Sequence, residues 1–195
     1  MVVLGLTGSV GMGKSTAARM LRRLRVPVHD ADAEVHQLLG PGGCAVPAVD
    51  QAFPGARKGN RIDRAALGRL VFDNPAALKQ LEAILHPRVR TAERRFLAAC
   101  RRRRAPVAVL DIPLLFETAG ESRCDGVIVM SAPPRLQRAR VLQRPGMTVA
   151  RFAAILAQQM PDAEKRRRAR WVVPTGLGQA LTLRRLKAIL REVRR

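Results

Sequence analysis

Aromatic residues are scarce in this sequence, which has no tyrosine, one tryptophan and five phenylalanines among 195 residues. Proteins that bind single-stranded nucleic acids without sequence preference stack the bases on aromatic side chains, so the scarcity argues against that class. Cysteine is also rare. Cys44, Cys100 and Cys124 are odd in number and form no CxxC pair, which argues against a disulfide framework and against a zinc site.

Acidic residues are few as well, 15 against 36 lysines and arginines, giving a formal net charge of +21. Three explanations stay open: arginines on solvated helix faces, which we favour, binding of a polyanion, or attraction of small phosphorylated substrates. Nucleic-acid binding is therefore compatible with the charge but is not favoured. No apolar run approaches the ~18 residues of a membrane span. Since no basic leader precedes the first apolar run, we also expect a cytoplasmic location.

Short apolar runs alternate with longer segments of helical periodicity along the chain. This alternation predicts an α/β fold in which a core of parallel sheet is flanked by helices, within a single domain. Asp63 and Asn74 are good residues to begin helices. The strands are expected at 2–7, 26–32, 107–113, 126–133 and 171–173. The helices are expected at 14–24, 33–39, most of 48–105, 134–143, 148–169 and 178–193.

Residues 8–15, GSVGMGKS, match the phosphate-loop pattern G-x4-G-K-[ST], between an expected strand and an expected helix. Glycines in such a loop let backbone N–H groups approach phosphate oxygens at the start of a helix. Lys14 would bridge the β- and γ-phosphates of a nucleoside triphosphate, Ser15 would ligate Mg²⁺, and Thr16 would contact the α-phosphate. The expected nucleotide-binding residues are Gly8, Gly11, Met12, Gly13, Lys14, Ser15 and Thr16.

Four further residues are candidates for catalysis, two aspartates and two arginines. Asp32 is expected at the carboxyl end of the second strand, where its carboxylate could orient an attacking hydroxyl. It could also cap the helix at 33–39, and the two roles are compatible. Asp30 would share that face of the strand and is the weaker candidate. Arg140 and Arg144, four residues apart on one helix face, could stabilise charge on a transferring phosphoryl group, or could be ordinary solvated arginines.

Taken in order along the chain, several segments resemble the bacterial dephospho-CoA kinase family of P-loop kinases. The resemblance covers nearly the whole sequence, and the segments DIPLLFE and LHP carry most of its specificity. It rests on residues 6–16, 29–32, 62–75, 85–90 and 111–117, on the spacing of Gln137, Arg140 and Arg144, and on QMPDAEK at 159–165.

The resemblance implies three parts: a P-loop kinase core at about 1–58, 106–135 and 169–195, a helical substrate (CoA) lobe at about 59–105, and an arginine-bearing lid at about 136–168. It implies that ATP phosphorylates the ribose 3′-hydroxyl of dephospho-CoA, giving coenzyme A and ADP, in the last step of coenzyme A biosynthesis. ATP and Mg²⁺ would be required.

The resemblance also implies roles for single residues. Asp32 matches the acid proposed as the base for the hydroxyl, and Asp111 would reach Mg²⁺ through water. From the residues alone, His86 would be a core or capping residue before Pro87. The residues expected to bind the substrate are Thr7, Asp32, His86, Arg90, Asp111 and Leu114.

Two positions depart from the family pattern. Arg170 stands where an aspartate is common, and Pro174 stands where an aspartate or asparagine is common, which puts contacts to the nucleotide base in doubt. Two alternatives to the assigned activity stay open: a kinase of another small metabolite, and a basic nucleic-acid-binding protein that keeps a nucleotide site.

Overall fold

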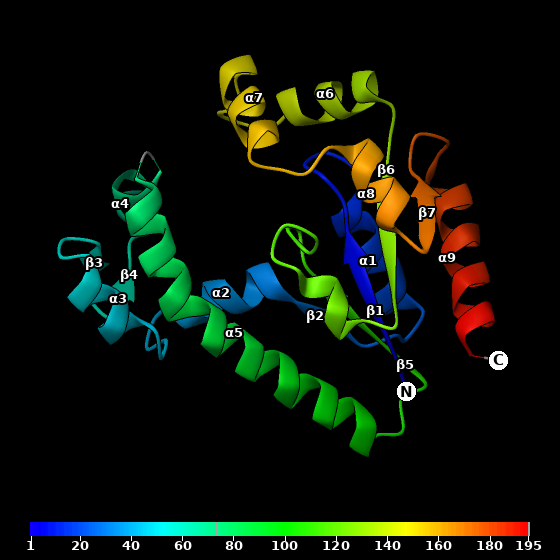
Figure 1. Ribbon diagram of the computed structural model, residues 1–195, viewed down its shortest axis with the longest axis horizontal. Coiled ribbons are helices and arrows are strands. Elements are labelled where there is room, and N and C mark those ends of the chain that lie inside the picture. The colour runs from blue at the N-terminus through cyan, green and yellow to red at the C-terminus, as the bar shows by residue number, and fades with distance from the viewer. Residues whose placement is uncertain (73, 195) are drawn as a thin grey trace. The chain divides into compact units, whose positions relative to one another are not determined.

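The chain folds into two compact units, which the computed structural model describes over residues 1–72 and 74–194 (Figure 1). The first unit comprises Met1–His29 and Cys100–Arg195, and the second comprises Asp30–Ala99. The division into core, substrate lobe and lid, with residues up to about 58 in the core, stays a prediction.

The first unit is built on a five-stranded sheet in the order β2-β5-β1-β6-β7. The pairs β1–β5, β1–β6 and β6–β7 are all parallel, so the predicted α/β class is confirmed. The predicted strands are present, several of them shorter than expected. They are β1 (Val2–Thr7), β2 (Val28–Asp30), β5 (Val107–Asp111), β6 (Gly126–Ser131) and β7 (Trp171–Pro174).

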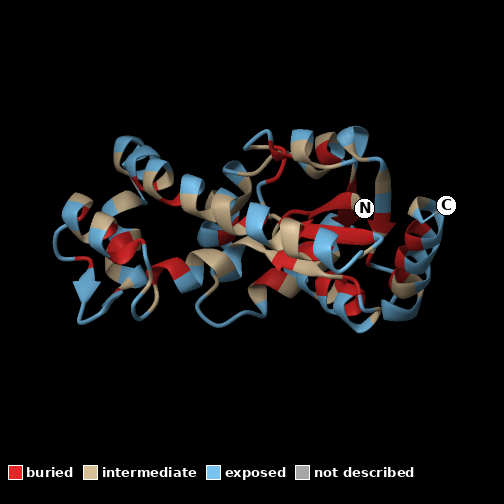
Figure 2. Cartoon of the chain, turned by 90° about the horizontal axis from the view of Figure 1, so that it is seen from below, coloured by how far each residue is buried: buried red, intermediate tan, exposed pale blue. Residues whose placement is uncertain are grey.

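Helices cover the sheet because its three central strands, β5, β1 and β6, are apolar along most of their length, as parallel strands buried on both faces are. Leu4 and Leu6 of β1 lie in one core cluster with residues of α1 (Lys14–Arg23) and α9 (Gln179–Val193). A separate cluster contains Val127 and Val129 of β6 with Leu115 from the loop after β5. Figure 2 shows buried residues concentrated in the strands of the sheet.

The remaining helices of the first unit are α6 (Pro134–Leu142), α7 (Val149–Ala157), α8 (Asp162–Arg168) and the short η1 (Gly120–Arg123). The single helix predicted at 148–169 is therefore wrong, since α7 and α8 are separate. Pro161 explains the break, because it lacks an N–H and disfavours helical backbone in the residue before it. No helix in the described residues is long and apolar enough to cross a membrane.

The second unit is mostly helical, as predicted, but it also contains a small hairpin that was not predicted. The two strands of the hairpin are too short to show an alternating pattern in the sequence, and Gly59, in the turn, takes a φ of +63°. The elements are α2 (Ala31–Leu39), α3 (Val46–Ala52), β3 (Arg57–Lys58), β4 (Arg61–Ile62), α4 (Arg64–Val71) and α5 (Pro75–Arg102), the last three residues of α5 belonging to the first unit.

Side-chain caps begin two of these helices where the sequence predicted them. The Asp63 carboxylate accepts hydrogen bonds from the N–H groups of Ala65 (2.9 Å) and Ala66 (3.2 Å) at the start of α4. Asn74 Oδ1 accepts from Ala77 N (3.0 Å) in the first turn of α5. Both predictions are confirmed.

The second strand ends earlier than predicted. β2 stops at Asp30, and Asp32 lies in the first turn of α2. The Asp30 carboxylate accepts from Ala33 N at 3.0 Å, so Asp30 is the N-cap. The predictions that Asp32 caps the helix and shares a strand face with Asp30 are therefore wrong. An N-cap aspartate has extended backbone, which lets a helix begin directly after a strand.

Candidate functional site: a phosphate loop and its supports

The loop between β1 and α1 has a backbone that only glycines fit. Gly11 and Gly13 have φ angles of +77° and +87°, in the left-handed region that other residues rarely adopt. A Cβ on Gly11 would lie 2.6 Å from Val141 Cγ2, and one on Gly13 would lie 3.2 Å from the side chain of Thr175. Neighbouring residues thus press closely on the outside of the loop.

Several N–H groups of this loop are left without acceptors. The Gly13 carbonyl accepts from Thr16 N and Ala17 N, both at 3.1 Å, which closes the first turn of α1. Within residues 1–72 and 74–194, no acceptor is present for the N–H groups of Gly11, Gly13, Lys14 and Ser15. Consecutive unpaired amides at a helix N-terminus form a nest for an anion. The residues therefore fit the phosphates of a nucleotide.

Lys14 lies beside this nest and is already paired. Its Nζ is 2.6 Å from Asp111 Oδ1, and Asp111, at the end of β5, is buried. Thr7 lies at the end of β1, where its hydroxyl donates to the Pro113 carbonyl at 2.9 Å. The structure thus brings the predicted residues Thr7, Lys14 and Asp111 to the carboxyl ends of two adjacent strands, β1 and β5.

Arg140 supports the loop from outside. Its guanidinium donates to Thr175 Oγ1 (2.9 Å) and to the Thr175 carbonyl (2.8 Å), and the Thr175 hydroxyl donates to the Met12 carbonyl (3.0 Å). Sequence reasoning missed Thr175. No local pattern marks it, because its partner Met12 is 163 positions away in the chain.

Arg144 does not accompany Arg140. Helix α6 ends at Leu142, so Arg144 lies beyond it, is exposed, and its side chain makes no hydrogen bond or ion pair with the described residues. The prediction that the two arginines share a helix face is wrong. The reason is the Pro145-Gly146 pair, which ends the helical segment before Arg144 can continue it.

Two glutamines hold the residue at the centre of the loop. Gln159 Oε1 accepts from Val10 N (3.0 Å), and Gln137 Nε2 donates to the Val10 carbonyl (2.8 Å). Both backbone groups of Val10 are thus satisfied by side chains from elsewhere in the first unit. In the sequence, these glutamines were noted only because their segments resemble the dephospho-CoA kinase family, and no role was predicted for them.

A buried ion pair lies close to the Gln159 segment, since one of its members also contacts Met160. Lys165 is fully buried, and its Nζ is 2.8 Å from Glu117 Oε1, which also accepts from Met160 N at 2.9 Å. The pair links α8 and the Gln159 segment to the loop that follows β5. The DIPLLFE and QMPDAEK segments of the sequence therefore meet at this ion pair.

The remaining predicted residues are exposed. Asp32 lies in the first turn of α2, and His86 and Arg90 lie four residues apart, one turn along α5. Because His86 is exposed in the middle of a helix, the alternative that it is a core or capping residue is wrong. Leu114, in the loop after β5, is 38% exposed.

The two departures from the family pattern lie at opposite ends of β7. Arg170 precedes the strand, where its guanidinium stacks 4.4 Å from the Trp171 ring and donates to Glu192. Pro174 ends the strand at the edge of the sheet, where a missing N–H is tolerated, and Thr175 N resumes pairing with the Ser131 carbonyl at 2.8 Å. The strand thus separates Arg170 from Thr175 and the phosphate loop.

Comparisons with known proteins agree with this geometry. The family model described as dephospho-CoA kinase matches residues 2–177. A dephospho-CoA kinase of Paramagnetospirillum magneticum is 68% identical over 166 residues, 85% of this chain and 78% of that protein.

Two solved structures are also similar. The crystal structure of TT1252 from Thermus thermophilus has a TM-score of 0.84 and 41% identity, over 98% of this chain and 97% of that one. The dephospho-CoA kinase from Campylobacter jejuni has a TM-score of 0.66 and 24% identity, over 98% and 96%, and shows the shared fold. The chain belongs to the dephospho-CoA kinase family.

Proposed function

We propose that this chain transfers the γ-phosphoryl group of ATP to the ribose 3′-hydroxyl of dephospho-CoA, giving coenzyme A and ADP, the last step of coenzyme A biosynthesis. Membership of the family supports the reaction. The observation that carries the donor site is the set of four unpaired amides, those of Gly11, Gly13, Lys14 and Ser15, beside the Lys14 ammonium.

In this proposal the loop binds the phosphates of ATP. The amides of Gly11, Gly13, Lys14 and Ser15 donate to phosphate oxygens, and Met12 and Gly8 contribute backbone to the same turn. Lys14 neutralises charge between the β- and γ-phosphates, and the Thr16 hydroxyl contacts the α-phosphate. Binding is favourable because these donors are already oriented before the nucleotide arrives.

Mg²⁺ fits the donor groups available, although no cluster of three or more acidic, histidine or cysteine side chains is present among the described residues. The Ser15 hydroxyl and the Asp111 carboxylate supply oxygen ligands, Asp111 through water, and Mg²⁺ typically keeps several waters. When bound, the ion would neutralise charge on the β- and γ-phosphates. Asp111 also contacts the Lys14 ammonium, at 2.6 Å.

Asp32 is proposed as the residue that accepts a hydrogen bond from the 3′-hydroxyl and takes its proton. The exposed carboxylate on the first turn of α2 is open to such a ligand. Thr7, His86, Arg90 and Leu114 are proposed to contact the acceptor.

The two lid arginines have different proposed roles. Arg140 acts mainly as a positioning residue for the loop, through Thr175. Arg144, which is exposed, is proposed to stabilise charge on the transferring group. A cytoplasmic location and a small-molecule partner, rather than nucleic acid, are part of the same proposal.

The test is ADP release by the purified protein with Mg²⁺ and ATP, with and without dephospho-CoA. NMR of the product locates the new phosphate on the ribose. We expect turnover that depends on the acceptor, with the phosphate on the 3′-oxygen. Failure to turn over dephospho-CoA, by protein that still binds ATP, would contradict the proposal and favour a kinase of another small metabolite.

A further inference from the structure

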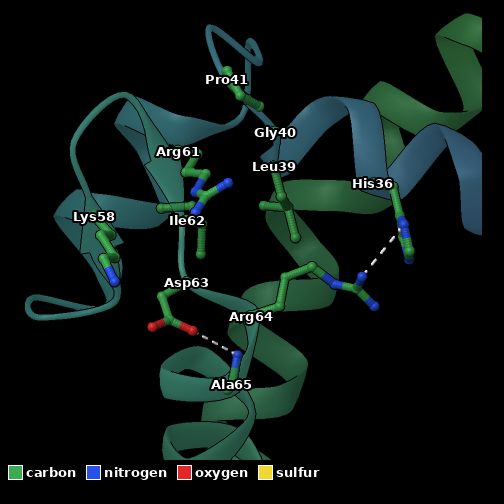
Figure 3. A pocket seen from close by; sticks show the side chains of 10 residues that line it. All are labelled: His36, Leu39, Gly40, Pro41, Lys58, Arg61, Ile62, Asp63, Arg64 and Ala65. Carbon is green, nitrogen blue, oxygen red and sulfur yellow. Dashed lines mark hydrogen bonds between the residues drawn. The ribbon is translucent and has the colours of Figure 1, made fainter.

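A pocket of about 370 Å³ lies entirely within the second unit (Figure 3). Its size is within the range of small-ligand sites. The end of α2, the β3–β4 hairpin and the first residues of α4 surround it, and a hydrogen bond of 3.0 Å from Gly42 N to the Asn60 carbonyl joins the loop after α2 to the hairpin turn. Residues that line it are His36, Leu39, Gly40, Pro41, Lys58, Arg61, Ile62, Asp63, Arg64 and Ala65.

The charge of this pocket is mostly positive. Lys58, Arg61 and Arg64 line it with a single carboxylate, that of Asp63. Asp63 accepts from the N–H groups of Ala66 and Ala65, and these hydrogen bonds hold its pKa below the ordinary value. Its charge therefore offsets only one of the three positive charges, and the pocket retains an excess of positive charge.

None of the three cations forms a close ion pair within residues 1–72 and 74–194, and Asp63 attracts one of them, Lys58, without contacting it. In the described part of the chain, no ion pair joins a carboxylate to Lys58, Arg61 or Arg64, whereas the neighbouring Arg57 is 3.0 Å from Asp50. Three cations gathered around a hollow with one carboxylate repel one another. An anion in the pocket would relieve that repulsion and accept their hydrogen bonds.

His36 connects the pocket to the first turn of α2. Arg64 Nη1 is 3.3 Å from His36 Nδ1, and since a guanidinium has only donors, that nitrogen accepts. Nε2 is then the protonated nitrogen and is available to donate. His36 lies four residues after Asp32, on the same helix face and about 6 Å further along the helix axis.

We propose that this pocket binds the diphosphate group of the acceptor, which rests on the proposed function. In dephospho-CoA the diphosphate is attached to the 5′-carbon of the ribose whose 3′-hydroxyl reacts, only a few covalent bonds away. A single helical turn from Asp32 to His36 spans a comparable length. Arg61 and Lys58 bind the phosphate oxygens, and His36 and Arg64 complete the pocket next to Asp32. None of these four residues was predicted from the sequence.

The competing explanation is that these cations are ordinary solvated charges of a basic protein. The two explanations differ in specificity. If a diphosphate binds here, Lys58 and Arg61 affect KM for one substrate only. General charge attraction would instead depend equally on all surface lysines and arginines of the unit, and would weaken with salt.

The experiment uses the full chain and two doubly substituted variants with equal charge loss. Lys58→Met/Arg61→Met removes two cations from the pocket. Lys79→Met/Arg95→Met removes one lysine and one arginine from exposed positions of α5 in the second unit that do not line it. For each protein, KM is measured for dephospho-CoA and for ATP at one fixed salt concentration, and thermal unfolding checks that both variants are folded.

We expect the pocket variant to raise KM for dephospho-CoA about 10- to 100-fold, because a hydrogen bond to a charged group commonly contributes about tenfold or more. KM for ATP and kcat should stay within about twofold of the unsubstituted protein. Adenosine, which lacks the diphosphate, serves as a second acceptor, and its turnover should be weak and equal in all three proteins.

Two results would overturn the inference. One is an unchanged KM for dephospho-CoA in the folded pocket variant. The other is an equal rise in the control variant, which would indicate general charge attraction. Both leave the proposed function intact, because that function fails only if the unsubstituted protein does not phosphorylate dephospho-CoA.

Discussion

The phosphate loop of the first unit and the cationic pocket of the second unit are organised in opposite ways. Around the loop, Lys14, Arg140 and Gln159 all have protein partners within 3.0 Å. In the pocket, Lys58 and Arg61 are exposed and form no close ion pair in the described residues. The protein's own contacts therefore fix the donor site, while most of the pocket's positive charge is left for a ligand to balance.

This contrast has an energetic consequence. Side chains already held in place lose little conformational entropy when a ligand binds, whereas each free, long side chain that becomes ordered costs about 0.5–1.5 kcal/mol. Substitutions near the loop should thus affect both folding and ATP use. Substitutions of the pocket's lysine and arginines should affect the acceptor alone.

The largest effect is expected for Lys14→Met, which removes the cation next to the phosphate nest. We expect kcat/KM for ATP to fall about a thousandfold, the loss typical of an oriented group that stabilises charge in the transition state. Steady-state kinetics measure it. Lys79→Met, in the second unit, is the control and should be unchanged. A loss of less than tenfold would show that the loop does not depend on this ammonium.

The next effect concerns folding, through the buried pair of Lys165 and Glu117. Lys165→Met leaves the Glu117 carboxylate without its cation, and removing one partner of a buried pair costs about 3–5 kcal/mol of unfolding free energy. Urea unfolding measures this, with Lys187→Met on an exposed site of α9 as control. Adding Glu117→Gln should recover part of the loss, because no unpaired charge then remains. No recovery would contradict the electrostatic explanation.

A smaller effect is expected at the two glutamines that hold Val10. Gln159 accepts a hydrogen bond, so Gln159→Glu keeps the contact, whereas Gln137 donates one, so Gln137→Glu places a carboxylate against a carbonyl oxygen. We expect Gln137→Glu to raise KM for ATP about tenfold, and Gln159→Glu to change it little, since a lost buried hydrogen bond costs about 1–3 kcal/mol. Equal effects of the two substitutions would show that Val10 is not held in this way.

The smallest effect is a pH dependence at Asp63, on the border of the pocket. Hydrogen bonds from Ala66 N and Ala65 N lower its pKa, so the charged carboxylate stabilises the folded state above the ordinary value of 3.8. This contribution is lost as the pH falls through the lower, folded-state pKa. Asp63→Asn should be less stable than the unsubstituted protein at pH 7, by urea unfolding, and the difference should close in acid. A difference independent of pH would contradict the assignment.

Local features of the fold and site followed from the sequence. The strand, loop and helix from Val2 to Arg23 depend on residues that are neighbours in the chain, so the sequence pattern predicted all three correctly. Asp63 and Asn74 are caps for the same reason. The sequence placed the end of the second strand at Asp32, but the strand ends at Asp30. Both aspartates are good residues to begin a helix, and only the structure shows which one caps α2.

Features that depend on distant contacts did not follow from the sequence. The support of Met12 by Thr175 joins residues at opposite ends of the chain, and no spacing rule links them. The pocket requires the hairpin from Arg57 to Ile62, whose strands are two residues long and leave no periodic pattern. The composition showed that the protein has an excess of positive charge, but it did not show that part of this charge lines a pocket.

The most direct test of the central claim, that donor and acceptor depend on different residues, is the kinetics of Asp32→Asn. This substitution keeps the shape of the side chain and removes its ability to take a proton. We predict that kcat for dephospho-CoA falls at least about a hundredfold, a typical contribution of general base catalysis. Calorimetric affinity for ATP should stay within about twofold. A kcat within a fewfold of the unsubstituted enzyme, or a parallel loss of ATP binding, would contradict the account.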